Sequence, residues 1–221
     1  MSADRSIAID PDISAYIQEH LNPPPDPIVA RIHERTVDRF GDLAGMNIGE
    51  DQGRFLKMLV QMLQARQVVE VGTFTGMSAL WLARGLREGG RLTCLELQDE
   101  PIEVARVGWQ EAGVDDRIDV RIGPALESLQ AMPADSTIDL AFVDADKEGY
   151  AAYVDEILPR LAPNGVLAID NTLWSGRVAD PDADDESTRA LQALNDDLAG
   201  REDLDVVILS VGDGVTLVRH R

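Results

Sequence analysis

The chain has 221 residues, a length that suits one domain with a large buried core. Its 40 acidic and 20 basic residues give a formal net charge of −20, which argues against electrostatic capture of nucleic acid or of an anionic membrane. The single cysteine, Cys94, excludes an intramolecular disulfide and is expected to be a buried thiol. Residues 1–10 lack the cationic start and apolar stretch of a signal peptide, and no later segment has the roughly 18 apolar residues of a membrane span. A cytoplasmic location is therefore expected.

Three helices are expected before the first strand, at residues 13–21, at 27–40 and from Asp51 onward. Asp26 and Pro27 provide an N-cap and a first helical residue for the second helix, and Asp51 is expected to cap the third. The segment 1–65 is either a lid over a cleft or a dimer surface, and the sequence does not choose between these alternatives.

From residue 67 onward, short apolar runs alternate with amphipathic segments. Strands are expected at 68–71, 91–97, 118–122, 138–143 and 166–170, and helices at 78–87, 100–112, 125–131 and 148–161. A last helix at 187–199 precedes strands at 205–211 and 215–219, which a turn at 212–214 pairs antiparallel. Because this alternation implies right-handed βαβ crossovers, the expected fold is α/β: a Rossmann-like, doubly wound, mostly parallel seven-stranded sheet (66–221) with a C-terminal antiparallel hairpin. Together with the N-terminal helices it forms a single domain, 1–221.

Acidic residues follow two of the expected strands. Asp144 comes directly after the apolar run 140–143, and Asp170 and Asn171 end the run 166–169. Because ligands bind at the carboxyl ends of strands in an open parallel sheet, these three side chains are expected to converge in one cleft. Their oxygen atoms suit Mg²⁺, Mn²⁺ or Ca²⁺. The sequence therefore predicts a site for a divalent cation.

Lys147 lies one helical turn beyond Asp144 and is one of only two lysines, the other being Lys57. A lysine, unlike an arginine, can lose its proton where the surroundings favour the neutral amine. Its place beside the predicted metal site makes Lys147 a candidate base. The alternative interpretation is an ordinary ion pair with Asp144 or Asp146.

The first strand-to-helix turn, 70–76 (EVGTFTG), contains glycines that let the backbone pass close to a ligand, at Gly72 and Gly76. The spacing is not G-x-G-x-x-G, and Glu70 would repel a pyrophosphate while attracting a cationic group. These features suit S-adenosylmethionine, which has an α-amino group and a sulfonium but no phosphate. A purely structural tight turn is the alternative.

Two further positions at strand ends are candidates for holding a nucleoside. Glu96, at the end of the second strand, is placed to accept the hydroxyls of a ribose, although acidic residues there also serve as helix caps. Gly123, Pro124 and Ala125 follow the third strand, where an adenine can lie against backbone. This segment equally suits a turn into the next helix.

Four stretches occur together in order: 69–78 (VEVGTFTGMS), 142–150 (FVDADKEGY), 170–174 (DNTLW) and 212–217 (GDGVTL). In them the chain resembles the cation-dependent O-methyltransferases of the caffeoyl-coenzyme A and catechol type, from about residue 46 to residue 219. The resemblance implies contacts to the methyl donor at Ile48, Glu70, Gly72, Thr73, Ser78, Glu96, Ala125, Asp144 and Asp146. It likewise implies a metal on Asp144, Asp170 and Asn171, with Lys147 and Asp144 as catalytic residues and Lys147 as the base.

The chain also departs from this family. Glu96 stands where some relatives have Asp, which keeps the ribose-binding carboxylate, and Arg54 replaces a common glutamine. Ser175 occupies the position of a substrate-contacting Asn of the plant enzymes, whose long substrate loop is not evident here. The candidate substrate contacts are Met46, Trp174 and Ser175, and for Trp174 a place in the core or in an interface is the alternative.

The resulting hypothesis is methyl transfer from S-adenosylmethionine to one hydroxyl of a vicinal dihydroxyphenyl, catechol-like small molecule, with a divalent cation and Lys147 as general base. A homodimer is expected from the resemblance, and neither a nucleic acid nor a membrane is expected as a partner. Two alternatives are a non-catalytic S-adenosylmethionine-binding sensor and an NAD-dependent oxidoreductase, the second disfavoured by the missing G-x-G-x-x-G.

Overall fold

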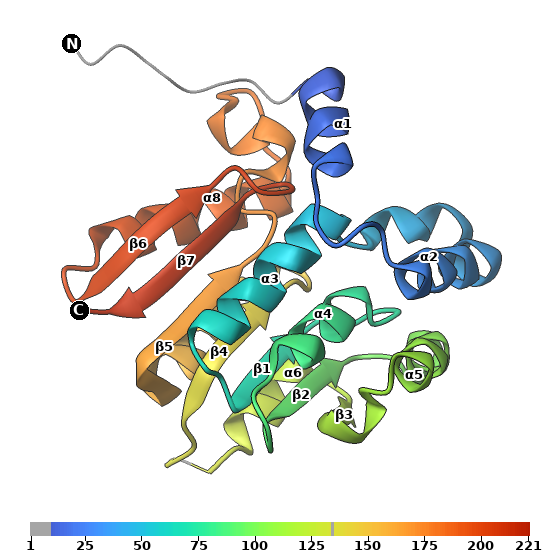
Figure 1. Ribbon diagram of the computed structural model, residues 1–221. Coiled ribbons are helices and arrows are strands. Elements are labelled where there is room, and N and C mark those ends of the chain that lie inside the picture. The colour runs from blue at the N-terminus through green and yellow to red at the C-terminus, as the bar shows by residue number, and fades with distance from the viewer. Residues whose placement is uncertain (1–9, 134) are drawn as a thin grey trace.

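The computed structural model describes residues 10–133 and 135–221, which form a twisted sheet with helices on both faces (Figure 1). The strands are β1 (Gln67–Val71), β2 (Arg91–Glu96), β3 (Ile118–Ile122), β4 (Ile138–Val143), β5 (Leu161–Ile169), β6 (Leu204–Leu209) and β7 (Val215–His220). The α-helices are α1 (Pro11–Glu19), α2 (Pro27–Phe40), α3 (Glu50–Met62), α4 (Met77–Gly85), α5 (Asp99–Ala112), α6 (Ala125–Gln130), α7 (Tyr150–Ile157) and α8 (Glu186–Gly200). Short 3₁₀ helices are η1 (Gly41–Met46), η2 (Asp115–Arg117), η3 (Lys147–Gly149), η4 (Leu158–Arg160) and η5 (Trp174–Ala179).

The seven strands follow the order β3-β2-β1-β4-β5-β7-β6. Strands β1 to β5 pair in parallel, whereas β7 is antiparallel to both β5 and β6. The strand order reverses between β1 and β4, and such a reversal opens a crevice for ligands at the carboxyl ends of the strands. The predicted doubly wound sheet with a C-terminal antiparallel hairpin is confirmed.

Side chains alternate along the strands between two apolar cores, one on each face of the sheet. Val68 and Phe142 point into the core covered by helices α2 to α5, while Val69 and Val71 point into the core covered by α6 to α8. Cys94 is buried in the first core, as expected. Because both faces are covered at the centre of the sheet, most of β4 and the second half of β5 are apolar on both sides and appear in the sequence as short continuous apolar runs.

The N-terminal helices begin largely as the sequence indicates. Asp26 caps α2, since its carboxylate accepts a hydrogen bond from the backbone N–H of Ile28 at 2.7 Å. The prediction that Asp51 caps the third helix is wrong: α3 begins at Glu50 with Gly49 as its N-cap, and Asp51 lies in the first turn. Glycine is itself a tolerated N-cap, and acidic residues in a first turn interact favourably with the helix dipole.

Helix α1 buries none of its side chains and stands apart from the sheet (Figure 1). Most of the N-terminal stretch that bears on cellular location, residues 1–9, lies outside the described residues. In the described part of the chain no helix is both long and apolar enough to cross a membrane.

The helix predicted at 148–161 is shorter in the structure, because α7 ends at Ile157 and a single 3₁₀ turn follows. Pro159 lacks a backbone N–H, and its ring would clash with the carbonyl of Asp155 in a continued α-helix. Strand β5 then begins at Leu161, ahead of the predicted start at 166, so its exposed first half was missed. The other predicted elements end within about two residues of the observed ones.

Candidate functional site

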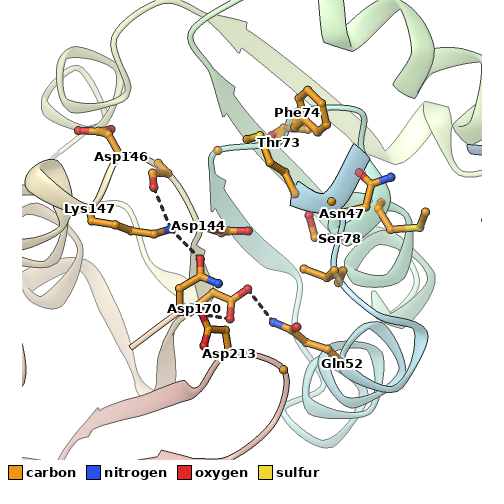
Figure 2. A pocket seen from close by; sticks show the side chains of 18 of the residues that line it. Asn47, Gln52, Thr73, Phe74, Ser78, Asp144, Asp146, Lys147, Asp170 and Asp213 are labelled. Atoms are coloured by element: carbon orange, nitrogen blue, oxygen red, sulfur yellow. Dashed lines mark hydrogen bonds and ion pairs between the residues drawn. The ribbon is translucent and has the colours of Figure 1, made fainter. Parts of the chain in front are cut away.

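A cavity of about 640 Å³ lies at the carboxyl ends of the central strands, a size that suits a small-molecule site. Figure 2 shows two groups of side chains that face one another across it. Asn47, Thr73, Phe74 and Ser78 lie on one side, and Asp144, Lys147 and Asp170 lie on the other. Loop 45–49 and residues Gly212 and Asp213 of the C-terminal hairpin also line it. The cavity therefore draws on the N-terminal segment, the parallel sheet and the hairpin together.

Hydrogen bonds of the sheet continue one residue past two of its strands. The backbone N–H of Asp144 donates to the carbonyl of Val71 at 2.8 Å, and that of Asp170 donates to the carbonyl of Val143 at 2.9 Å. Because β4 lies between β1 and β5, these bonds set the first residues after the three strands side by side. Local strand geometry thus accounts for the convergence that the sequence predicts.

Gly72 directly follows β1 and lies against Asp144. Its φ is +84°, and a Cβ built on it would lie 1.9 Å from the carbonyl oxygen of Asp144. Both the left-handed backbone and the close approach therefore require glycine. Four residues on, Gly76 has a φ of +78° and packs against Trp109, whose indole N–H donates to the Gly76 carbonyl at 3.0 Å.

Glu96 holds the loop after β1 in place. Its Oε2 accepts hydrogen bonds from the backbone N–H groups of Thr73 at 3.0 Å and Phe74 at 2.7 Å, and its Oε1 accepts one from Gln98 at 3.1 Å. Phe74 has a φ of +48°, a rare value for an aromatic residue, which persists because this carboxylate fixes the loop. Glu96 is thus an organiser of the loop, a function compatible with its predicted contact to a ribose.

Glu70 is fully buried, on the strand face that it shares with Val68, and does not line the cavity. Its Oε2 accepts hydrogen bonds from the hydroxyl of Thr73 at 2.8 Å and the thiol of Cys94 at 3.3 Å. Within the described residues its Oε1 is buried without a partner. Burial raises the pKa of Glu70 from 4.5 to about 7, although the neighbouring hydroxyls of Ser78 and Thr73 oppose the rise. The glycine loop therefore lies over a carboxyl group that is costly to ionise.

Asp144 and Asp170 are carboxyl groups buried near one another. Burial raises the pKa of both, and for Asp170 the charge of Asp144 adds to the rise, to about 7, while Lys147 opposes it. Gln52 donates to Oδ2 of Asp170 at 2.7 Å, and the backbone N–H of Asn171 donates to Oδ1 at 2.7 Å. Both oxygens of Asp170 are thereby oriented, as the contact between Gln52 and Asp170 in Figure 2 illustrates.

Lys147 is 8% exposed and is held by four oxygen atoms. Its Nζ lies within hydrogen-bonding distance of Asn171 Oδ1 (2.6 Å), Tyr150 Oη (2.7 Å), the Ala145 carbonyl (3.0 Å) and Asp144 Oδ1 (3.1 Å). The ion pair with Asp144 that the sequence left as an alternative is present. Since the same nitrogen also contacts Asn171, Lys147 lies against two of the three predicted metal ligands.

The three predicted ligands fit a hard divalent cation by their chemistry. Asp144 and Asp170 supply carboxylate oxygens and Asn171 a carboxamide oxygen, which are the donors that such cations prefer. Buried carboxyl groups with raised pKa values favour a positive charge beside them. In residues 10–133 and 135–221 no three His, Cys, Asp or Glu side chains group as metal ligands, so the set depends on Asn171.

The backbone after β5 is left-handed at Asn171 (φ +56°), Trp174 (φ +47°) and Ser175 (φ +52°). Asparagine tolerates this region better than most residues, whereas for Trp174 it is strained and requires support from neighbouring groups. The hairpin gives that support, because Leu173 N–H donates to the Asp213 carbonyl at 3.1 Å and Ser175 N–H to its Oδ1 at 2.5 Å. The turn places Trp174 in the cavity wall and leaves Ser175 outside it.

Most of the predicted site residues line the cavity. They are Met46, Ile48, Gly72, Thr73, Ser78, Asp144, Asp146, Lys147, Asp170, Asn171 and Trp174. Four others do not line it: Glu70, Glu96, Ala125 and Ser175. Glu70 is fully buried, Glu96 is bonded to the backbone of the glycine loop, and Ala125 begins α6, so their contacts to a ligand stay predictions.

Sequence reasoning missed four residues of the site. Gln52 is 3% exposed and lies on the buried face of α3, one turn before Leu56. A polar side chain on the apolar face of a helix was the sequence feature that could have indicated its place in the site. Asn47 accepts a hydrogen bond from Thr75 Oγ1 at 2.9 Å, which ties loop 45–49 to the glycine loop. Tyr150 and Asp213 belong to recognised motifs, but nothing local marks their contacts with Lys147 and Ser175.

The sheet is doubly wound, and the cavity lies where its strand order reverses. A glycine loop, several carboxylates and a lysine line this cavity. Together these features are typical of a Rossmann-like enzyme that binds a nucleoside cofactor. The sequence model of the O-methyltransferase family matches residues 14–221. The chain is 36% identical over 215 residues to a putative caffeoyl-CoA O-methyltransferase of Arabidopsis thaliana, covering 95% of this chain and 90% of the relative. It is 37% identical over 185 residues to a catechol O-methyltransferase of Mycobacterium tuberculosis, covering 83% and 82% of the two chains.

Among solved structures, an O-methyltransferase from Bacillus cereus in complex with SAH superposes with a TM-score of 0.86 at 30% identity, covering 95% of this chain and 97% of the other. The chain therefore belongs to the O-methyltransferase family. The enzyme class predicted from the sequence is confirmed, and this membership replaces the oxidoreductase and sensor alternatives.

The close contact at Gly72 yields a test of the loop. Gly72→Ala should lower the free energy of unfolding by about 2 kcal/mol more than Gly89→Ala, because only the first Cβ meets backbone atoms. Gly89 is a matched control, with a φ of +72° and nothing within 4 Å of its built Cβ. Urea denaturation of both variants measures the difference, and equal losses would show that the loop can move away from Asp144.

The raised pKa of Glu70 yields a second test. A raised carboxyl pKa contributes stability that is present below the unfolded value of 4.5 and is lost as the pH rises through about 7. The non-titrating Glu70→Gln variant lacks this loss, so between pH 5.5 and 8.0 its free energy of unfolding should rise by about 2 kcal/mol relative to wild type. Urea denaturation at the two pH values measures it. A constant difference between the proteins would contradict the assignment.

Proposed function

We propose that the protein transfers a methyl group from S-adenosylmethionine to one hydroxyl of a small molecule that carries a vicinal dihydroxyphenyl group, with a divalent cation in the site. The observation that carries the proposal is the placement of Lys147. Its Nζ lies 3.1 Å from Asp144 Oδ1 and 2.6 Å from Asn171 Oδ1, at the wall of a cavity of about 640 Å³. A base beside a set of hard oxygen ligands suits the removal of a hydroxyl proton.

Family membership and the SAH named for the Bacillus cereus relative support S-adenosylmethionine as the donor. The glycine loop would bind it through Gly72, Thr73 and Ser78, which line the cavity, with Ile48 on the opposite loop. S-adenosylmethionine carries a cationic sulfonium and ammonium, and this part of the site presents carboxyl groups instead of the phosphate-binding spacing of a dinucleotide fold. Glu96 and Ala125, at the ends of β2 and β3, would hold the ribose and the adenine.

Asp144, Asp170 and Asn171 would hold the cation, for which Mg²⁺, Mn²⁺ and Ca²⁺ are all suitable by donor chemistry. When bound, it would lower the pKa of the acceptor hydroxyl and orient it. Gln52 contributes by fixing Oδ2 of Asp170 at 2.7 Å, so that the carboxylate cannot rotate freely. Such support for a ligand's orientation is typical of metal sites.

Lys147 would accept the proton of the attacking hydroxyl at Nζ, as general base. Tyr150 and the Ala145 carbonyl hold this nitrogen in place at 2.7 and 3.0 Å, so little movement is needed before proton transfer. Trp174 lines the cavity beside it and would form a wall against the aromatic ring of the acceptor. Much of the remaining acceleration would come from holding the oxygen in line with the transferred methyl group.

We also infer a homodimer in the cytoplasm, in agreement with the sequence. Apolar side chains exposed on α3, Met58 at 59% and Met62 at 76%, and on the edge strand β6, Val207 at 49%, are candidate contacts for a second copy. Neither a nucleic acid nor a membrane is proposed as a partner, since the net charge of −20 disfavours both.

Lys147→Met tests the base. Turnover of a catechol should fall by about 10²- to 10⁴-fold, while the affinity for S-adenosylmethionine should change little. Lys57→Met is the matched control, because it removes the only other lysine, on α3, and should retain activity. Steady-state kinetics and isothermal titration with the donor measure the two effects. Near-normal turnover of Lys147→Met would remove Lys147 from the mechanism.

The double variant Asp170→Ala, Asn171→Ala tests the metal. Wild-type protein should bind Mn²⁺ in isothermal titration, and it should methylate 3,4-dihydroxybenzoate with added Mg²⁺ but not with EDTA. The double variant should neither bind Mn²⁺ nor methylate this acceptor with added Mg²⁺. The expected loss follows from removing two of three ligands. Wild-type activity that persists after complete chelation would refute the role of a divalent cation.

A further inference from the structure

Three polar side chains from separate parts of the chain form a closed ring of hydrogen bonds behind one wall of the cavity. They are Thr36 of α2, Asn47 of loop 45–49 and Thr75 of the glycine loop. Thr75 Oγ1 lies 2.9 Å from Asn47 Oδ1, Thr36 Oγ1 lies 2.8 Å from Thr75 Oγ1, and Asn47 Nδ2 lies 3.4 Å from Thr36 Oγ1. The two threonines are fully buried, whereas Asn47 lines the cavity. The hydrogen-bonded ring therefore joins the N-terminal segment to the first loop of the sheet.

The chemistry of the three groups determines the direction of each hydrogen bond. Thr75 donates to Asn47 Oδ1, because a carbonyl oxygen can only accept, and a hydroxyl has a single hydrogen to donate. Thr36 is then the donor to Thr75, and Asn47 Nδ2 donates to Thr36. The Thr36 hydroxyl also lies 2.8 Å from the Ile32 carbonyl, which already accepts the backbone hydrogen bond of the α-helix. Each member of the ring donates once and accepts once, an arrangement in which hydrogen bonds strengthen one another.

Segment 41–49, which contains loop 45–49, has few other contacts that hold it. Ala44 is its one buried residue. Among the described residues, Asn47 makes the only side-chain hydrogen bonds of this segment. Glycines at positions 41, 45 and 49 leave its backbone conformationally free. Because a segment with so few buried contacts opens easily, the hydrogen-bonded ring is the main attachment of the loop.

Loop 45–49 and the glycine loop face the same space. Ile48 from the first and Gly72 and Thr73 from the second line one cavity. Figure 2 shows Asn47 on the same side of this cavity as Thr73 and Phe74. A ligand held between the two loops is therefore released only when one of them moves.

We propose that Thr36, Asn47 and Thr75 are positioning residues for the methyl donor, and that their ring holds loop 45–49 closed over the bound donor and slows its release. The inference rests on the proposed binding of S-adenosylmethionine between the two loops. Opening the loop withdraws Asn47 and leaves the buried Thr75 hydroxyl without its acceptor, a loss that opposes opening. Of the two alternatives for the N-terminal segment, a lid or a dimer surface, loop 45–49 is then part of a lid.

Thr75→Val tests the ring, because valine keeps the branched shape of threonine and removes its hydroxyl. S-adenosylhomocysteine should dissociate about 5- to 10-fold faster from this variant than from wild type, as expected for the loss of one hydrogen bond. The rate is measured by chasing the radiolabelled compound with an excess of unlabelled compound. Thr75→Ser keeps the hydroxyl and should release the compound at nearly the wild-type rate. Hydrogen exchange of the amides in segment 41–49 should likewise be faster in Thr75→Val than in Thr75→Ser.

Thr216→Val is the matched control for a buried hydroxyl. Thr216 lies on β7, outside the lining of the cavity, and its Oγ1 donates to Thr172 Oγ1 at 2.9 Å. The control should lose a similar free energy of unfolding in urea denaturation and still release S-adenosylhomocysteine at the wild-type rate. An equal acceleration in Thr75→Val and Thr216→Val would assign the effect to a general loosening of the fold and overturn the proposal.

Asn47→Ala breaks the ring at its other end. If Asn47 and Thr75 act through their shared hydrogen bond, the double variant Asn47→Ala, Thr75→Val should release S-adenosylhomocysteine no faster than the faster single variant. If the two accelerations multiply instead, the residues act independently, and the ring is not the cause.

The same variants separate this inference from the proposed function. Release of S-adenosylhomocysteine that depends on the ring, without methylation of any catechol, would refute the proposed methyl transfer and support the function of the ring. Wild-type release rates in both Thr75→Val and Asn47→Ala would overturn the function of the ring and leave the methyltransferase intact. A wild-type protein that does not bind S-adenosylhomocysteine would refute both.

Discussion

The structure of the site depends on two carboxyl groups, Asp144 and Asp170, buried so near one another that the charge of the first raises the pKa of the second. Such an arrangement opposes folding unless positive charge and hydrogen-bond donors surround it. The fold supplies Lys147 beside Asp144 and Gln52 beside Asp170. Burial and mutual repulsion still make the two carboxyl groups costly to ionise. A positive charge bound beside them would reduce this cost.

The same constraint explains features that lie farther from the carboxyl groups. The two acids meet because β4 pairs in parallel with β5, and the other neighbour of β4, β1, leads the chain past Asp144, where only Gly72 fits. After β5 the chain must turn at once to present Asn171, which accounts for the left-handed backbone there. The antiparallel hairpin is the element that holds this turn, through Asp213. It therefore serves the site as well as closing the sheet.

The sequence predicted the site residues whose placement follows from local strand patterns. It missed the residues whose placement depends on contacts between distant parts of the chain. Asp144, Asp170 and Asn171 each follow an apolar strand, and parallel pairing alone brings their side chains together. The contact between Gln52 and Asp170 joins residues 118 apart in sequence, and no local signal pairs an α3 glutamine with that acid. Likewise, Asp213 was recognised within a turn and a motif, but the sequence assigned it no partner. The N-cap at Asp51 failed because Gly49 and Asp51 both suit the start of a helix, and local preference does not decide between them.

Overall similarity does not identify the acceptor. The chain is 36% identical to a relative named for caffeoyl-CoA and 37% identical to one named for catechol, two values too close to favour either. The predicted ligands and base also fail to discriminate, because they would serve any acceptor with two neighbouring hydroxyls. Discrimination must come from groups that touch the rest of the acceptor. In this chain the side chains that line the cavity beyond the predicted ligands and base include Met46 and Trp174.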